Sequence, residues 1–492
     1  MSVPLLRPRE LSAATRALMR SRLLRPYRPN QLARVGLGLR RYGFGPAMGP
    51  LAAATLYPSS PGLLDETEAF SHAQLEAACS GVAAGLRDAG LTAGDGLGLL
   101  ARNSAGFYLA MVGAARAGLD VTYLNTGFTS EQVADVVQAQ GLRAVVYDEE
   151  LADRVPPSVL GVPVEQPSAE PEAASITDMA RSGATHDGAP GEPSRHVILT
   201  SGTTGRPKGA ARTGGGVDSV LALLSGLPYR AQETHLMAAP MFHAWGWMNT
   251  LLTMLLSSTT VTTRRFDPER TLALVERHRV DVLVAVPVML QRILELPPEV
   301  LDRYDTSSLR VVAVSGSPLS ERLAHSFMDR FGDVLYNLYG STEAAFATVA
   351  APADLRAAPG TAGRPLAGVR VRVVDESGRD CPIGTPGAIR VRSGDAMVAG
   401  EGEPRRAGRH TRTGDLGWFD AEGRLFVGAR EDDMIVSGGE NVYPVVVESA
   451  LHAQPEIAEV AVVGVDDYRF GQALVAHVVL RGGGTATPGE LR

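Results

Sequence analysis

Val197-Ile-Leu-Thr-Ser-Gly-Thr-Thr-Gly-Arg-Pro-Lys-Gly209 begins as an apolar strand and opens into a loop of glycines and hydroxyl side chains. Glycines let backbone N–H groups approach a polyphosphate, hydroxyls add hydrogen-bond donors, and Lys208 adds a positive charge. A Walker A loop needs a lysine followed by Ser or Thr at the start of a helix, whereas Gly209 follows Lys208 here. The stretch therefore predicts a phosphate loop of a different kind; the alternative is an ordinary Gly/Ser-rich turn.

Lys208 is the only lysine among the 47 basic residues of the chain, and all the others are arginine. A compact ammonium interacts with phosphates differently from a planar guanidinium. We therefore expect Lys208 to contact the phosphates that the loop binds.

Length and composition predict a soluble globular protein with more than one domain. A chain of 492 residues exceeds the roughly 250–300 residues that one core holds, so we expect a large domain and a smaller one. Cys79 and Cys381 cannot build a disulfide framework or a zinc site, which indicates a reducing, cytoplasmic setting. The sequence shows no secretory signal and no run of 18 strongly apolar residues. The uncharged stretch 236–263 includes His243 and Asn249 and predicts a buried helix and strand.

Helical and strand-like stretches alternate along most of the chain, which is typical of largely parallel sheets covered by helices. Residues 151–194 lack periodicity and predict a surface connection. Helices are predicted over Ser71–Ala89 and Ser130–Gln140, the second with Ser130 as its N-cap. Strands are predicted over Asp95–Leu100, Ala144–Tyr147, Val197–Thr200, Val280–Val286 and Leu309–Val314.

Beyond residue 369 the pattern changes to short strands separated by turns, which predicts a β-rich subdomain. Its strands are Val369–Val374, Gly387–Arg392 and Arg424–Val427. The predicted α/β fold has three parts: an N-terminal arm (1–45), a large domain of helix-covered, largely parallel sheets (46–428, with the β-rich subdomain at about 369–428), and a small, incomplete α+β C-terminal domain (429–492).

Residues 1–45 contain ten arginines and one acid, Glu10, with leucines between them, although the whole chain has a net charge of −7. Two interpretations fit this arm. It can make peripheral contact with anionic lipid on the inner face of the cell membrane, or form an amphipathic helix on the enzyme's own body.

The loop at 201–209 resembles the signature of the adenylate-forming superfamily, which includes acyl-CoA and aryl-CoA synthetases, peptide-synthetase adenylation domains and beetle luciferases. Similar motifs follow in order through Tyr339-Gly-Ser-Thr-Glu343, Thr413-Gly-Asp415, Gly428-Ala-Arg430 and Ser437-Gly-Gly-Glu-Asn-Val-Tyr-Pro444. The resemblance spans roughly residues 70–480.

This resemblance implies ATP, Mg²⁺ and CoA as cofactor and co-substrates. It places Tyr339 against adenine, Asp415 on the ribose, Thr342 on the α-phosphate and Glu343 on Mg²⁺. The implied ATP and AMP contacts are Thr200, Ser201, Gly202, Thr203, Thr204, Gly205, Lys208, Gly316, Ser317, Pro318, Tyr339, Gly340, Ser341, Thr342, Asp415 and Arg430.

The resemblance also implies an acyl pocket and a mobile C-terminal part. His243, Trp247 and Gly340 are placed at the pocket, with core packing as the alternative for the tryptophan. Asp432 corresponds to a hinge residue, and Ser437, Gly438, Gly439 and Glu440 to a loop beside the pantetheine arm. The implied catalytic residues are Lys208, Thr342, Glu343 and His243.

The reaction implied is two-step carboxylate activation: acyl-AMP forms from ATP, and CoA then takes the acyl group. The residues of these motifs are most similar to those of bacterial fatty acyl-CoA synthetases. This resemblance would place the chain in lipid metabolism. An aryl-CoA ligase, an acyl-AMP ligase and a non-catalytic relative that binds nucleotide or acyl-CoA stay open as alternatives. No nucleic-acid partner is expected.

Relatives carry a second catalytic lysine in a Gly-Lys motif near the C-terminus. No lysine follows Lys208 here, and the sequence stops at Thr487-Pro-Gly-Glu-Leu-Arg492. We accordingly expect either a shortened form of the enzyme or a much reduced rate of the adenylation step.

Overall fold

The structure is a computed structural model. It describes residues 15–165, 174–186, 188, 192–200, 208–212, 217–341, 345–393, 398–399, 410–430, 435–437, 440–442, 444, 447–448, 451, 454, 456–467, 469 and 471–480.

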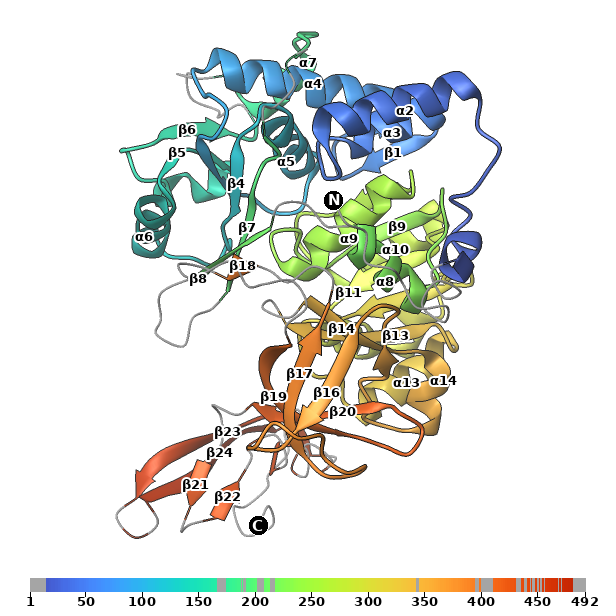
Figure 1. The fold of residues 1–492 in the computed structure, drawn as a ribbon, viewed down its shortest axis with the longest axis vertical. Coiled ribbons are helices and arrows are strands. Elements are labelled where there is room, and N and C mark those ends of the chain that lie inside the picture. The colour runs from blue at the N-terminus through green and yellow to red at the C-terminus, as the bar shows by residue number, and fades with distance from the viewer. Residues whose placement is uncertain are drawn as a thin grey trace.

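Two large sheets form the body of the molecule (Figure 1). The first has seven strands in the order β18-β8-β7-β4-β3-β5-β6, and β3 to β7 are parallel. Its strands are β3 (Gly96–Leu100), β4 (Asp120–Tyr123), β5 (Leu142–Tyr147), β6 (Leu160–Pro163), β7 (His196–Thr200), β8 (Lys208–Arg212) and β18 (Val398–Ala399).

The second sheet has nine strands in the order β15-β14-β13-β12-β11-β9-β10-β1-β2. The six strands from β13 to β1 in this order are parallel, and the edge strands are antiparallel. Its strands are β1 (Pro61–Leu64), β2 (Ala69–Ser71), β9 (Thr234–Met237), β10 (Thr259–Thr262), β11 (Val282–Ala285), β12 (Val311–Val314), β13 (Leu335–Ser341), β14 (Ala345–Ala350) and β15 (Arg364–Pro365).

Helices cover both sheets, and one hydrophobic core connects them. Every residue of α5 is buried, and its core cluster includes strand residues of both sheets, such as Leu97 and Val284. The helices are α2 (Pro29–Tyr42), α3 (Gly49–Leu56), α4 (His72–Asp88), α5 (Ala105–Arg116), α6 (Ser130–Gln140), α7 (Ile176–Arg181), α8 (Val217–Gly226), α9 (Ala244–Leu255), α10 (Pro268–His278), α11 (Pro287–Leu294), α12 (Pro298–Leu301), α13 (Glu321–Phe331) and α14 (Pro352–Ala357), with a 3₁₀ turn η1 (Glu149–Arg154).

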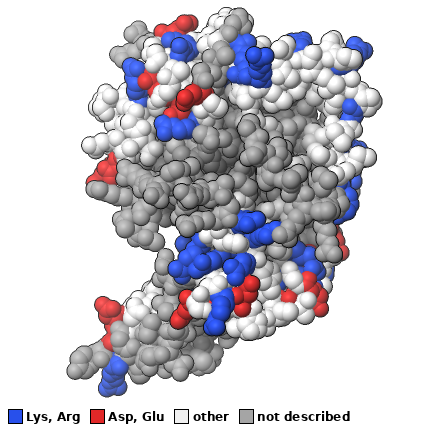
Figure 2. Space-filling view, viewed as in Figure 1, with Lys and Arg blue, Asp and Glu red and all other residues white. Residues whose placement is uncertain are grey.

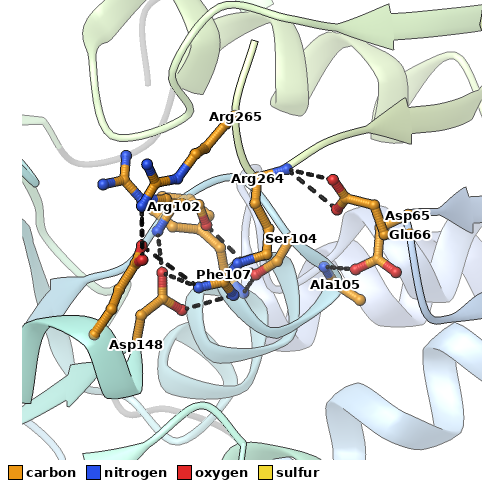
Figure 3. Close-up of polar contacts among 10 residues, drawn as sticks. Asp65, Glu66, Arg102, Ser104, Ala105, Phe107, Asp148, Arg264 and Arg265 are labelled. Carbon is orange, nitrogen blue, oxygen red and sulfur yellow. Dashed lines mark hydrogen bonds and ion pairs between the residues drawn. The ribbon is translucent and has the colours of Figure 1, made fainter. Parts of the chain in front are cut away.

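Ion pairs tie the strand ends of the two sheets together (Figure 3). Asp148, after β5, is almost fully buried and accepts hydrogen bonds from Arg102 N, after β3, at 2.8 Å and from Arg264 Nη1, after β10, at 3.2 Å. Burial raises the pKa of Asp148, which the hydrogen bond from Arg102 N and the charge of Arg264 oppose. Asp65 Oδ2 also accepts from Ala105 N at 2.7 Å, so the start of α5 is fixed to the second sheet.

A four-stranded antiparallel sheet, β16-β17-β19-β20, packs beneath the second large sheet. Its inner face, including Val373, Ile389 and Val391, forms a cluster with Ala347 of β14, and Tyr339 packs against this cluster. The strands are β16 (Arg370–Val374), β17 (Gly387–Arg392), β19 (Thr411–Phe419) and β20 (Leu425–Arg430). This confirms the predicted β-rich region.

A fourth sheet, β22-β21-β24-β23, extends away from the body at the C-terminal side (Figure 1). Its strands are β21 (Ile435–Ser437), β22 (Glu440–Val442), β23 (Ile457–Asp467) and β24 (Gly471–Leu480). The predicted fold class, largely parallel α/β sheets with a smaller C-terminal region, is confirmed.

Two local predictions need correction. Helix α6 spans the predicted residues, but Thr129, not Ser130, caps it by accepting from Gln132 N. Residues 151–194 are more than a surface connection, because β6 completes the edge of the first sheet and α7 buries Ile176 and Met179. The apolar residues of this stretch are too widely spaced to show a period, and nonlocal pairing with β5 supplies the strand.

The described part of the N-terminal arm lies against the body of the enzyme. Gly38 of α2 contacts α3 so closely that an added Cβ would lie 2.6 Å from Leu51 Cδ2. Arg20 Nη2 donates to the carbonyl of Leu224 at 2.8 Å. None of the described helices is long and apolar enough to span a bilayer.

Candidate active site

Predicted site residues from three segments follow neighbouring parallel strands of the second large sheet. Strands β9, β11, β12 and β13 are parallel, so their carboxyl ends lie together, where open α/β sheets bind ligands. The segment Gly316-Ser317-Pro318 follows β12 and is exposed, with Gly316 at φ +94°. Tyr339, Gly340 and Ser341 end β13, and the loop after β9 leads to His243.

Tyr339 and Asp415 form the central polar contact of this edge. The Tyr339 hydroxyl donates to Asp415 Oδ2 at 2.5 Å, which links β13 of the large sheet to β19 of the small one. Burial and the negative charge of Asp415 raise the pKa of Tyr339, so the phenol stays protonated. The hydrogen bond from Asp415 N to Thr413 Oγ1, at 3.1 Å, and the positive φ of Gly414 (+83°) shape the predicted turn.

Arg430 lies beside this pair. It is the register partner of Asp415 between β19 and β20. Its side chain is exposed, and a Cβ added to Gly414 would be 3.3 Å from Arg430 Nη2. The Asp415 carboxylate, the Tyr339 phenol and the Arg430 guanidinium therefore lie close together. This set of hydrogen-bond donors and acceptors suits a ribose and its phosphate.

His243 precedes the first turn of α9 and faces solvent. Its ring lies 4.5 Å from the Phe242 ring centroid. Desolvation by the surrounding protein lowers the pKa of His243, so the imidazole is neutral near pH 7 even though water reaches it. A neutral, accessible ring can donate a hydrogen bond through its N–H to a carboxylate substrate.

Two residues that the sequence did not single out position the His243 loop. Asn103 is buried; its Nδ2 donates to the carbonyls of Met237 (3.2 Å) and Ala239 (2.9 Å), and its Oδ1 accepts from Met241 N (2.7 Å). The sequence signal that could have identified Asn103 is its position as a polar amide shortly after a buried parallel strand, β3. Gly246 is the other, because a Cβ there would lie 2.2 Å from the Pro240 carbonyl oxygen.

Trp247 is fully buried in the main core cluster. Its Nε1 donates to the Tyr123 hydroxyl at 2.8 Å, and that hydroxyl lies 2.9 Å from His196 Nδ1. Burial lowers the pKa of His196 to about 4, so this histidine is neutral. These contacts favour the packing alternative for Trp247, and its place in the acyl pocket stays a prediction.

Other predicted site residues cannot be compared with the structure. Ser201, Gly202, Thr203, Thr204, Gly205, Thr342, Glu343, Asp432, Gly438 and Gly439 lie outside the described residues, as does the C-terminal stretch 481–492. The backbone places Lys208 opposite Thr200 in the β7–β8 pair, and Ser437 opposite Glu440 in the β21–β22 pair. Across the described ranges, no group of three or more His, Cys, Asp or Glu side chains is arranged to hold a metal ion.

The glycine-rich loop after β7, together with the tyrosine–aspartate pair at the converging strand ends, defines a class of proteins: the adenylate-forming enzymes. The chain belongs to the AMP-binding enzyme family. The family's sequence model matches residues 51–400, and that of the AMP-binding enzyme C-terminal domain matches residues 446–492. ATP, Mg²⁺ and CoA, all predicted, are used by adenylate-forming CoA ligases.

Similar proteins act on different acids. The fatty acid–[acyl-carrier-protein] ligase ScoC of Streptomyces coeruleorubidus is 29% identical over 88% of this chain and 86% of its own. A feruloyl-CoA synthase of an Amycolatopsis species is 31% identical over 92% of each chain. The structure of o-succinylbenzoate CoA synthetase from Bacillus subtilis, in complex with its acyl-adenylate intermediate, has a TM-score of 0.77 at 25% identity and covers 90% of each chain.

Proposed function

We propose that this ligase joins a fatty acid to CoA through an acyl-adenylate. In the first step a carboxylate oxygen attacks the α-phosphorus of ATP and pyrophosphate leaves. In the second step the thiolate of CoA attacks the acyl carbon and AMP leaves. The observation that carries the proposal is the Tyr339–Asp415 contact at the same strand edge as His243.

The described residues support a division of roles at this edge. Tyr339 offers an aromatic face to adenine while its hydroxyl holds Asp415, whose carboxylate we assign to the ribose hydroxyls. The exposed segment 316–318 borders the same space. We assign the phosphates to Lys208, Thr342 and the loop 201–205.

We assign the Mg²⁺ ligand to Glu343 because of its position shortly after strand β13. Strand β13 ends at Ser341 on the edge that holds Asp415, and Glu343 follows two residues later with the hard oxygen ligands that Mg²⁺ prefers. When bound, the ion would neutralise phosphate charge.

The choice of a fatty acid as the substrate rests on the residues of two motifs and on one relative. The segment Pro240-Met-Phe-His-Ala-Trp-Gly246 and the loop 437–444 are most similar to fatty acyl-CoA synthetases, and the Streptomyces coeruleorubidus relative acts on fatty acids. The feruloyl-CoA synthase supports an aryl acid as the alternative substrate. An acyl-AMP ligase and a nucleotide-binding relative are the remaining alternatives.

Pyrophosphate release over a panel of fatty and aromatic acids tests the proposal, with thioester formation measured in parallel. We expect both products with medium- or long-chain fatty acids. Release with aromatic acids alone would reassign the substrate, release without thioester would indicate an acyl-AMP ligase, and no release with any acid would contradict adenylation.

We further propose that the cytoplasmic enzyme contacts an anionic membrane through its N-terminal segment. Residues 15–64 contain eight arginines and no acid. Exposed apolar side chains gather in the same segment: Met19, Leu24, Leu32, Leu37, Leu39 and Phe44. In the upper right of Figure 2, arginines lie among uncharged residues there. Exposed leucines beside arginines favour binding to anionic lipid.

Flotation with vesicles tests this contact. We expect the intact chain to float with anionic vesicles and less with neutral ones, and a variant with Leu32, Leu37 and Leu39 changed to serine to lose flotation. Val288→Ser, which removes an exposed apolar side chain elsewhere, is the matched control. Equal partitioning of all three proteins would contradict the proposal.

A further inference from the structure

The outer face of the small antiparallel sheet carries an unusual set of arginines. Register pairs place Arg370 opposite Arg392 and Arg372 opposite Arg390, and Arg390 is in turn opposite Arg412. Because opposed residues share a face, these five side chains point away from the buried valines of the same strands. Figure 2 shows the basic side chains gathered over β16, β17 and β19. We call these five residues the arginine face.

Like charges directly opposite each other destabilise a sheet, so this arrangement needs a compensating anion. Within the described residues, Asp380 provides one, through a 2.6 Å ion pair with Arg372 Nε. Among the described residues, no ion pair is seen for Arg370, Arg390 or Arg392 themselves.

Two buried nitrogens on this face lack hydrogen-bond partners. They are Arg390 Nε and His410 Nε2. Desolvation and the surrounding arginines lower the pKa of His410, so this imidazole is neutral near pH 7. The unpaired Arg390 Nε–H is a buried donor that an oxyanion would satisfy, and the neutral His410 ring adds a second unsatisfied polar atom beside it.

The arginine face is close to the candidate active site. Arg412 and Asp415 lie on the same strand, β19, three residues apart, which corresponds to roughly 10 Å along the strand. A molecule whose reactive end lies at the adenylate could therefore reach the arginine face with a distant, negatively charged end. CoA has this form, with its phosphates separated from its thiol by the flexible pantetheine arm.

We propose that Arg370, Arg390 and Arg392 bind the phosphate groups at the nucleotide end of CoA. The inference rests on the proposed CoA ligase function and adds the residues that recognise the acceptor. Guanidinium groups bind phosphate oxygens in a bidentate manner. Three neighbouring arginines on one face, with the Arg390 Nε unpaired, suit the 3′-phosphate and pyrophosphate groups. Of the large apolar side chains exposed in the described residues, none belongs to β16, β17 or β19, which favours a phosphate over a lipid surface.

Steady-state kinetics of Arg390→Gln and of the double variant Arg370→Gln/Arg392→Gln test this site. We expect the KM for CoA to rise about tenfold or more, while the KM for ATP and pyrophosphate release stay unchanged. Pantetheine, which has no phosphate, should react equally with all proteins. Arg379→Gln is the matched control, because this exposed arginine pairs with Asp375 in the neighbouring turn.

A binding measurement separates this inference from the proposed function. Adenosine 3′,5′-bisphosphate should bind the wild-type chain, more weakly at higher salt, and bind Arg390→Gln about tenfold more weakly. That result supports the phosphate site even if no acid is activated. An unchanged KM for CoA together with unchanged bisphosphate binding would overturn it, as would a loss seen equally with pantetheine. An effect only on a phosphopantetheinylated carrier protein would also overturn it and would indicate a protein-docking face.

Discussion

Tyr339→Phe removes one oxygen atom and with it the hydroxyl that holds Asp415, while the ring stays in place. The bond is 2.5 Å long and ends on a carboxylate. Hydrogen bonds to ionised groups contribute about 1.5–3 kcal/mol, which corresponds to a roughly 10- to 150-fold change in an equilibrium constant. We therefore expect the KM for ATP to rise within this range, because the nucleotide must now order the carboxylate that receives its ribose.

The assay is pyrophosphate release at saturating acid, with ATP varied, for Tyr339→Phe, Asp415→Asn and the double variant. The double variant should be scarcely worse than Asp415→Asn alone, because the tyrosine acts through the aspartate. Tyr336→Phe, on the same strand, is the matched control and should leave the KM for ATP unchanged. Additive losses, or a Tyr339→Phe enzyme with normal KM for ATP, would refute the reasoning.

The other predictions concern the loop and the buried histidines. Asn103→Leu removes three hydrogen bonds beneath the His243 loop. The variant should raise the KM for the acid more than the KM for ATP in steady-state kinetics. It should also lower the free energy of unfolding by about 2–4 kcal/mol, which the melting temperature reports. Gly246→Ala should lower kcat/KM for the acid at least about tenfold through displacement of the same loop; unchanged kinetics would rule out this close approach. Burial lowers the pKa of His196 to about 4 and of His235 to about 3. The unfolded chain binds more protons between those values and about 6.5, so stability should fall as pH drops below about 6.5, at up to about 1.4 kcal/mol per pH unit for each histidine. The melting temperature of His235→Phe should therefore depend less steeply on pH than that of the wild type.

The sequence allowed the prediction of elements whose signals are local. Helix α4 matches the apolar repeat predicted over Ser71–Ala89, and Ser71 caps it by accepting from Gln74 N. The strands of the β-rich region follow from alternation and turns, and β17 has the predicted bounds. These features depend on neighbours within a few residues, so one segment contains the information.

Nonlocal pairing was not predictable in this way. The contact of Tyr339 with Asp415 joins residues 76 positions apart on different sheets, and only resemblance to a family placed them together. Strand β1 pairs with β10, nearly two hundred residues later, which no local pattern encodes. Asn103 shows the same limit, because its role depends on carbonyls of a loop more than 130 residues away.

The central claim, that this enzyme activates a carboxylate by attack on the α-phosphorus of ATP, is tested most directly by tracing oxygen. A fatty acid labelled with ¹⁸O in its carboxylate is incubated with enzyme, ATP and CoA, and the masses of the products are measured by mass spectrometry. The carboxylate oxygen that bonds to the α-phosphorus stays with that phosphorus when the thiolate displaces AMP, so the AMP formed should carry one ¹⁸O. Unlabelled AMP alongside thioester, or label in inorganic phosphate with ADP, would contradict the account.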